Sequence, residues 1–348
     1  DFTINALMFD PRRDEVLDFF GGQADLRNRV LRHTSEAFVE DPLRVLRGMQ
    51  FAARFDLRAA PETVALCRSI QPAYAELALE RVRDEWFKWA SKSIVPSVGL
   101  RFLADSGWLE HFPEVAALRG TPQDSEWHPE GDVFTHTAHC CDALVKLPEW
   151  QAAGDDSRIA WMLAVLAHDF GKPAVTHEAE RNGRMRIVSP GHEEGGVAPA
   201  LKFLERIHSP HAIRDRVPPL VANHLAHLQT VTDRAVRRLA KRLEPETIFG
   251  LCVVIMADHN GRPPKPPCVP EGVKALLTKA EELRVRDSAP KPILQGRHLI
   301  AAGMPPGREF KSILHEAFEA QLEGQFGDLE GAQAWRDQRL GRSPPTAE

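Results

Sequence analysis

The stretch that most constrains this fold is WMLAVLAHDFGKP, residues 161–173. Its apolar residues up to position 167 predict a buried helix, because they leave no polar face for solvent. The helix ends in His168 and Asp169, and the following Gly-Lys-Pro is typical of a helix stop. Adjacent imidazole and carboxylate groups there either cap an ordinary helix end or hold a ligand, for which a metal ion is the best chemical fit.

Further histidines and acids lie at predicted helix ends and turns along the chain. They are His136 in DVFTHT, His168 and Asp169 in AHDFGK, His192 in PGHEEGG, His224 in VANHL and Asp258 in MADHNGR. A single histidine is more often a core or surface residue than a metal ligand. In combination, imidazole nitrogens and carboxylate oxygens suit transition metals, Mg²⁺ or Mn²⁺ with open positions for water. The combination therefore predicts a metal site.

The motifs WHPEGDVFTHT and AVLAHDFGKP, in the order H…HD…H…H…D, resemble those of the HD phosphohydrolase superfamily. The resemblance implies a divalent metal ion (Mg, Mn, Ni or Co) with His136, His168, Asp169 and Asp258 as its ligands. It also implies catalytic roles for His168, Asp169 and Lys172, and a second metal or phosphate site at His192 and His224. His139, Cys140, His227 and His259 fall outside the resemblance and are predicted to be packing or supporting residues.

The first 115 residues carry the motifs of another family. DFTINAL, DFFGGQADLRNRVLR, EDPLRVLR at 40–47 and LERVRDE at 79–85 follow one another in the order found in bacterial class II CCA-adding tRNA nucleotidyltransferases and poly(A) polymerases, which they resemble. Bacterial members of that family often carry an HD block next. The resemblance implies CTP and ATP as substrates and tRNA as partner. The nucleotide-binding residues that it implies are Asp1, Asp41, Arg44, Arg47 and Arg81.

The chemistry of the EDPLR segment agrees with a nucleotide-selecting role. Asp41 can only accept hydrogen bonds and Arg44 can only donate them, and three residues apart they lie on one side of a helix. Cytosine and adenine each show an amino donor beside a ring-nitrogen acceptor, whereas uracil and guanine show a carbonyl beside a ring N–H. The pair can therefore accept C and A and oppose U and G. In isolation the segment would better fit an N-capped helix whose arginine faces water, and the neighbouring motifs in family order reverse that preference.

The sequence contains neither the Gly-Gly phosphate-binding turn nor the DxD pair of that family's polymerase head. The chain also begins at Asp1 in a strand-like alternation. We therefore expect a fragment of a longer protein that lacks the N-terminal polymerase head. Such a fragment would select nucleotide without polymerising it alone.

Composition narrows the class of protein. The chain has 348 residues with 43% hydrophobic and 27% charged residues, as in ordinary soluble globular proteins. Its net charge of −5 means that an RNA partner would have to use local basic patches. No apolar stretch is long enough to cross a membrane, and the five cysteines lack a CxxC pair. We therefore expect a cytoplasmic protein.

The predicted fold is mainly α, with a small β remnant at the N-terminus. Residues 1–34, including FTINALMF and GGQADL, predict short strands and turns, whereas helical periodicity dominates from position 41 onward. The predicted segments are 1–34, the end of the nucleotidyltransferase head; 35–120, a helical neck that selects nucleotide and binds RNA; 128–262, an all-α HD domain; and 263–348, a helical C-terminal region. The basic run 234–242 predicts a solvated helix face.

Three functions remain open at this point. The chain is part of a tRNA nucleotidyltransferase with an HD centre that hydrolyses 2′,3′-cyclic or 2′-phosphates, or a stand-alone HD phosphohydrolase that acts on nucleotides. The third alternative is a non-catalytic tRNA-binding subunit that needs a separate polymerase head.

Overall fold

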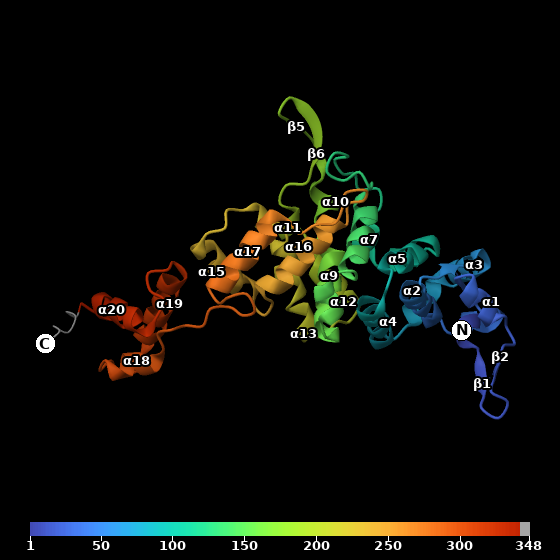
Figure 1. Cartoon of the computed structure of the whole chain (residues 1–348), viewed down its shortest axis with the longest axis horizontal. Coiled ribbons are helices and arrows are strands. Elements are labelled where there is room, and N and C mark those ends of the chain that lie inside the picture. Colours follow the sequence, from blue (N-terminus) through green and yellow to red (C-terminus); the bar gives the residue numbers. More distant parts are fainter. Residues whose placement is uncertain (342–348) are drawn as a thin grey trace. The chain divides into compact units, whose positions relative to one another are not determined.

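The computed structural model describes residues 1–341, which are mostly helical with a few short strands (Figure 1). The predicted mainly α fold is thereby confirmed. Residues 1–226 and 250–270 form one compact unit, and residues 227–249 pack with the chain from 271 onward in a second unit. This division differs from the predicted boundary after 262, because the segment 227–249 packs against C-terminal helices.

The first unit contains all six strands and most of the helices of the described chain. Its helices are α1 (Gly22–Arg27), α2 (Leu43–Phe55), α3 (Pro61–Ser69), α4 (Leu79–Lys92), α5 (Pro96–Asp105), α6 (Pro113–Ala116), α7 (Val133–Leu144), α8 (Pro148–Ala152), α9 (Asp155–Ala167), α10 (Lys172–Val175), α11 (His192–Gly195), α12 (Val197–Arg206), α13 (His211–Arg214), α14 (Val217–Asn223) and, from residue 250, α16 (Ile248–Asn260). Short 3₁₀ helices lie at Thr3–Asn5, Glu36–Glu40, Gln71–Glu76, Trp108–His111 and Ala226–Leu228.

The strands form three two-stranded sheets. Strands β1 (Met8–Asp10) and β2 (Glu15–Leu17) pair antiparallel, with Met8 opposite Leu17. Strands β3 (Val30–Leu31) and β4 (Arg58–Ala59) pair in parallel. Strands β5 (His177–Arg181) and β6 (Arg184–Val188) form an antiparallel hairpin that projects from the helices in Figure 1.

Two N-terminal predictions are wrong. Within FTINALMF only Met8 and Phe9 belong to a strand. Thr3–Asn5 form a 3₁₀ helix, because the Asn5 carboxamide oxygen accepts a hydrogen bond from the Phe2 backbone N–H at 3.0 Å and closes a turn. GGQADL is helix α1 rather than a strand or turn. The Asp18 carboxylate starts that helix by accepting from the backbone N–H groups of Gly22 and Gln23, at 2.8 and 2.9 Å.

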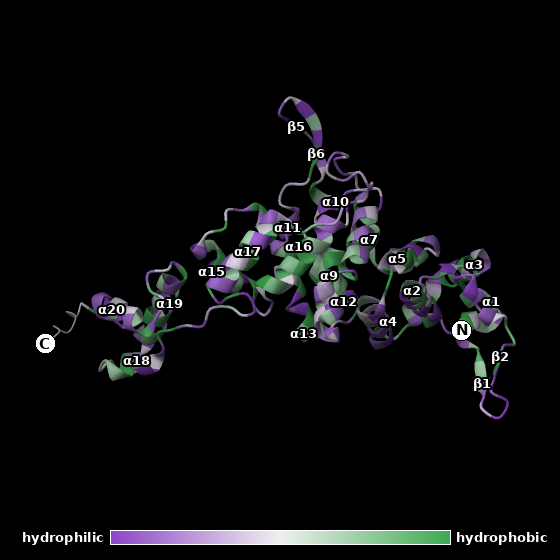
Figure 2. Cartoon of the chain, in the orientation of Figure 1, coloured by the Kyte–Doolittle hydropathy of each residue, from purple (hydrophilic) through white to green (hydrophobic). Residues whose placement is uncertain are grey.

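The predicted buried stem before His168 is present as helix α9. Every residue of this helix from Ile159 to Ala167 is buried. Helix α16 is buried in the same way from Leu251 to Ala257, and Figure 2 shows the apolar colouring of both helices. Helix α9 packs against α7, α14 and α4, so its C-terminal end is fixed inside the unit.

The second unit contains α15 (Asp233–Leu243), α17 (Glu271–Glu282), α18 (Gly296–Ala301), α19 (Arg308–Leu322) and α20 (Leu329–Arg339). An apolar cluster around Leu299, Ile313 and Phe326 joins the last three of these helices. The basic run 234–242 lies on α15, and its Arg238 guanidinium pairs with the carboxylates of Glu319 and Glu323 on α19. Neighbouring acids thus neutralise much of the run that was predicted to face solvent.

No helix among residues 1–341 is long and apolar enough to cross a membrane.

Close packing of α5 on α2 generates a stability prediction. A Cβ atom added at Gly99 would lie 2.6 Å from the Met49 carbonyl oxygen and 3.1 Å from Ala53 Cβ, so Gly99→Ala forces the helices apart. We expect it to reduce the free energy of unfolding by about 1–3 kcal/mol. Urea denaturation followed by circular dichroism measures this loss. Gly195→Ala is the control because nothing lies within 4 Å of its added Cβ, and equal losses in both variants would contradict the packing argument.

Candidate metal centre and nucleotide site

Four buried imidazoles and two buried carboxylates meet inside the first unit. His136 lies within α7, His168 and Asp169 follow α9, His192 begins α11, His224 follows α14, and Asp258 lies near the end of α16. The structure thus brings together all six of the residues predicted as metal or phosphate ligands. Their burial means that any charge among them needs a compensating partner.

One local arrangement orients three of the imidazoles. The Nδ1 atom of each ring lies within hydrogen-bond distance of the backbone carbonyl oxygen three residues earlier. The distances are 2.6 Å from His168 to Val165, 2.7 Å from His192 to Ser189 and 2.7 Å from His224 to Val221. A carbonyl oxygen only accepts, so Nδ1 carries a proton and Nε2 is turned toward the centre, where it presents a lone pair whenever the ring is neutral. The histidine ligands of metal ions are commonly oriented in this way.

The fourth imidazole is oriented by a side chain instead. His136 Nδ1 lies 2.6 Å from Glu130 Oε1, in the loop before α7. His128 Nδ1 lies 2.9 Å from the same oxygen. Burial raises the pKa of Glu130, but hydrogen bonds from His128 and His136 outweigh this and lower it to about 2. The carboxylate is therefore ionised, and it directs the Nε2 lone pair of His136 inward.

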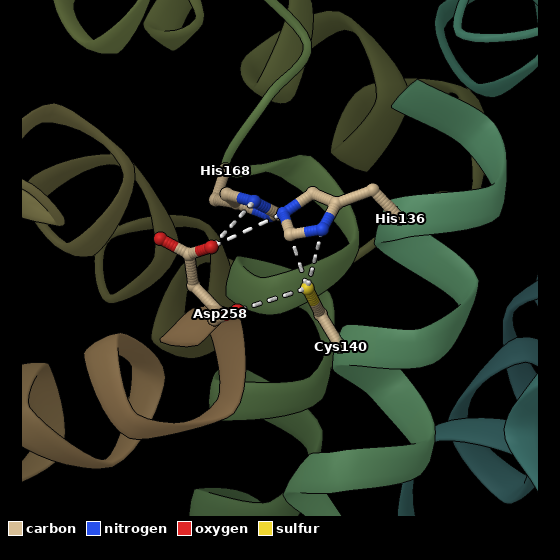
Figure 3. A group of neighbouring side chains, drawn as sticks. All are labelled: His136, Cys140, His168 and Asp258. Carbon is tan, nitrogen blue, oxygen red and sulfur yellow. Dashed lines mark hydrogen bonds and ion pairs between the residues drawn. The ribbon is translucent and has the colours of Figure 1, made fainter. Parts of the chain in front are cut away.

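The first group of ligand atoms contains the four residues predicted to bind the primary metal. His136 Nε2 lies 3.1 Å from Asp258 Oδ1, and His168 Nε2 lies 3.2 Å from Asp169 Oδ2. The distance between His136 Nε2 and Asp169 Oδ2 is 3.9 Å. Figure 3 shows His136, His168 and Asp258 pointing toward one another from three separate helices.

The second group contains His192, His224 and the other oxygen of Asp169. The two Nε2 atoms lie 3.2 Å apart, and His192 Nε2 lies 3.4 Å from Asp169 Oδ1. Burial lowers the pKa of His224 to about 3, so its ring is neutral. Two unprotonated nitrogens that face each other at this distance repel unless a cation or proton lies between them. Asp169 therefore presents one oxygen to each group.

The chemistry of these atoms fits a divalent ion. His168 Nε2 and Asp169 Oδ2 are buried, and neither makes a well-oriented hydrogen bond among the described residues. Their charged neighbours are each other at 3.2 Å and, for Asp169 Oδ2, the Lys172 ammonium at 2.8 Å. Buried polar atoms in this condition are costly unless another group satisfies them. A set of imidazole nitrogens and carboxylate oxygens suits Mn, Co, Ni and Zn.

Two cations balance the buried carboxylates. Lys172 Nζ lies 2.8 Å from Asp169 Oδ2 and also 2.8 Å from Gln123 Oε1. Arg262 Nη2 lies 2.8 Å from Asp258 Oδ1. Burial alone would raise the pKa of both aspartates. For Asp169, the charges of His168 and Lys172 outweigh the effect of burial and hold its pKa well below the usual range. For Asp258, the charge of Arg262 outweighs burial and has the same effect on its pKa.

Sequence reasoning missed Glu130 and His128 and set Cys140 aside. The signal for the first two was present, because both lie in WHPEGD directly before the first histidine motif. Cys140 is one helical turn after His136, and its sulfur lies 3.3 Å from His136 Nε2. His136, Cys140, His168 and Asp258 together form a group whose ligand atoms all lie within 4.8 Å of one another.

The residues predicted to select nucleotide also lie close together, at the start of α2 and of α4. Asp41 Oδ2 pairs with Arg81 Nη2 at 2.8 Å. Asp1 pairs with Arg47 at 2.8 Å and lies 3.7 Å from Arg44. Asp41 itself has extended backbone just before α2, which begins at Leu43, and its carboxylate accepts from the Leu43 N–H. All five side chains are partly exposed.

Comparison with known proteins identifies the family. A multifunctional CCA protein of Xanthomonas oryzae is 36% identical over 304 residues, which are 83% of this chain and 71% of that protein. The chain belongs to the multifunctional CCA protein family. Another member, from Xanthomonas campestris, is 38% identical over 274 residues, which are 75% of this chain. The chain spans 63% of the length of that relative.

Solved structures share the fold at low identity. A Bacillus stearothermophilus CCA-adding enzyme in complex with CTP has a TM-score of 0.61 and 19% identity, over 98% of this chain and 73% of that chain. A Thermotoga maritima CCA-adding enzyme complexed with tRNA has a TM-score of 0.54 and 18% identity, over 98% of this chain and 72% of that chain.

The Poly A polymerase head domain matches residues 1–32 of this CCA-family chain. The boundary of the segment 1–34 as the end of a head stays a prediction. The expectation that the polymerase head is absent is not confirmed, because residues 1–32 themselves match the head domain.

The hydrogen bond from His136 to Glu130 generates a prediction on metal affinity. In Glu130→Gln the side chain keeps its shape but loses the charge that orients His136 and His128. We expect divalent metal affinity to fall about 10–100-fold, measured by isothermal titration calorimetry. Glu180→Gln, on the exposed β5 strand, should leave the affinity unchanged. Unchanged affinity in Glu130→Gln would show that His136 does not depend on this carboxylate.

Proposed function

We propose that this chain takes part in CCA addition to tRNA 3′ ends, using CTP and ATP. We further propose that its histidine centre is an HD-type, metal-dependent phosphohydrolase site for 2′,3′-cyclic or 2′-phosphates. Family membership supports the first part. The second part rests on one observation, the convergence of four Nε2 atoms and two carboxylates in a buried space.

The nucleotide-selecting role is supported by the arrangement around Asp41. Its carboxylate can accept the exocyclic amino group of cytosine or adenine, and Arg81 or Arg44 can donate to the neighbouring ring nitrogen. Uracil and guanine would place a carbonyl against the carboxylate and an N–H against the guanidinium, which leaves buried charge unpaired. Asp1 holds Arg44 and Arg47 near this position through ion pairs.

Each charged group in the histidine centre has a distinct task in hydrolysis. His136, His168, Asp169 and Asp258 would hold the ion, with His192 and His224 at a second ion or at a phosphate. When bound, such an ion lowers the pKa of water toward neutrality and polarises a phosphoryl oxygen. Lys172 keeps its ammonium group beside Asp169, where it can bind a phosphoryl oxygen. The surrounding apolar helices exclude bulk water from these charges.

A substitution at Asp41 tests the nucleotide site. In Asp41→Asn the side chain gains a donor and loses the charge that pairs with Arg81, so discrimination of CTP and ATP against UTP and GTP should fall roughly tenfold. Fluorescence titration of the chain with all four nucleotides measures it. Asp84→Asn, on the same helix as Arg81 and paired with Arg83, is the matched control. Equal affinity of the wild type for all four nucleotides would refute a selecting role.

A substitution at His168 tests the hydrolytic centre. His168→Ala removes the imidazole at the end of the buried helix α9, whose Nε2 atom lies 3.2 Å from Asp169 Oδ2. Bound divalent metal and hydrolysis of 2′,3′-cyclic nucleotides should both fall by about 100-fold or more, measured by elemental analysis and by product chromatography. His177→Ala, in the exposed β5 strand, should change neither. A wild-type chain that holds no metal and hydrolyses nothing would instead favour a non-catalytic tRNA-binding role.

A further inference from the structure

The sulfur of Cys140 lies inside the first ligand group. Cys140 is fully buried on α7, one turn after His136. Its Sγ atom lies 3.3 Å from His136 Nε2, the atom that faces Asp258, and 3.7 Å from the Asp258 carbonyl oxygen. Figure 3 shows the sulfur beside the His136 ring, in contact with both ring nitrogens and with the main-chain oxygen of Asp258. The sulfur and the ligand atoms of His136, His168 and Asp258 all lie within 4.8 Å of one another.

Tight packing fixes the sulfur in this place. The turn after α16 passes Cys140 so closely that a Cβ atom at Gly261 would lie 2.4 Å from the sulfur and 2.7 Å from the Cys140 backbone N and Cα. Only glycine fits there. Gly261 follows Asp258 by three residues, so the close approach sets the position of the aspartate and that of the sulfur together.

We propose that Cys140 is a sulfur ligand of this metal centre and that it biases the centre toward a thiophilic ion such as Co²⁺, Ni²⁺ or Zn²⁺ over Mg²⁺. This inference rests on the metal centre of the proposed function. Adjacent ligand atoms about 2.0–2.3 Å from one four- to six-coordinate ion lie roughly 2.8–3.8 Å apart. The distances of 3.3 Å from Sγ to His136 Nε2 and 3.1 Å from that nitrogen to Asp258 Oδ1 lie within this range.

The chemistry of the step balances without any other reactant. The thiol S–H bond breaks, its proton passes to solvent, and the sulfur electron pair forms the bond to the ion. Thiolate ligands bind Co²⁺, Ni²⁺ and Zn²⁺ well and Mg²⁺ poorly, whereas carboxylates bind all four. A centre of imidazole and carboxylate alone would therefore be less selective than one that includes sulfur.

The other cysteines provide matched controls. Cys141 is the next residue, is equally buried, and belongs to no metal-holding group among residues 1–341. Cys268 is exposed and lies 3.2 Å from His259 Nε2, so it could bind added metal adventitiously. Cys268→Ser removes that source of background.

Cobalt spectroscopy tests the assignment. The chain is stripped of metal and titrated with Co²⁺ under anaerobic conditions. A cobalt–thiolate bond produces a ligand-to-metal charge-transfer absorption in the near ultraviolet, which imidazole and carboxylate ligands do not. We expect this band in the wild type, in Cys141→Ser and in Cys268→Ser, and we expect its loss in Cys140→Ser. If Cys140→Ser fails to fold, the spectra of Cys141→Ser and Cys268→Ser decide the point, because loss of the band in either variant would assign it to another cysteine and overturn the role of Cys140.

Metal selectivity provides a second readout. Cys140→Ser should weaken Co²⁺ and Zn²⁺ binding on the order of tenfold and change Mg²⁺ binding by less than about threefold. A wild type that binds Co²⁺ with the stoichiometry of the centre but without the charge-transfer band would overturn the role of Cys140 and leave the metal centre standing. A wild type that binds no divalent ion would overturn both proposals. The two failures are therefore distinguishable.

Discussion

The structure of the histidine centre depends on one buried carboxylate, that of Asp169. Its two oxygens face two different groups of imidazoles, and Lys172 pairs with the oxygen that faces His168. A charge buried this deeply would be expelled or protonated without such partners. Helix α9 places this carboxylate, and the carboxylate links the helix to the segments that carry Lys172 and His192. The position of each of these segments therefore depends on the others.

Apolar packing supplies the rigidity that this arrangement requires. Helix α9 is buried from Ile159 to Ala167 and α16 from Leu251 to Ala257, so the polar residues that follow these runs have little freedom to move away from one another. Short backbone-anchored hydrogen bonds then set the orientation of the rings. Packing fixes where the imidazoles lie, and local hydrogen bonds fix which nitrogen faces the centre. The residues proposed to select nucleotide, by contrast, depend on partly exposed ion pairs, which leaves their side chains accessible.

The sequence predicts the helical fold and the six converging residues because both depend on local pattern. Apolar runs define buried helices, and motif order places His136 and Asp258 in one group although they are 122 residues apart. Glu130 lies directly before the first histidine motif, but which ring its carboxylate orients becomes visible only once the loop before α7 folds back on His136. The β5–β6 hairpin was missed despite a usable signal, since Asn182 and Gly183 both adopt positive φ and form its two-residue turn. The 3₁₀ helix near the start shows a side chain overriding an alternating pattern.

The way in which the rings are held has an evolutionary consequence. Three of the four imidazoles hydrogen-bond to the main chain, which every amino acid at Val165, Ser189 or Val221 would supply equally. Those three positions can drift among residues of similar size without releasing the rings. His136 relies on the side chain of Glu130, which a single codon change can remove. Natural loss or retuning of this centre is therefore expected to begin in the loop before α7 rather than at the helix ends.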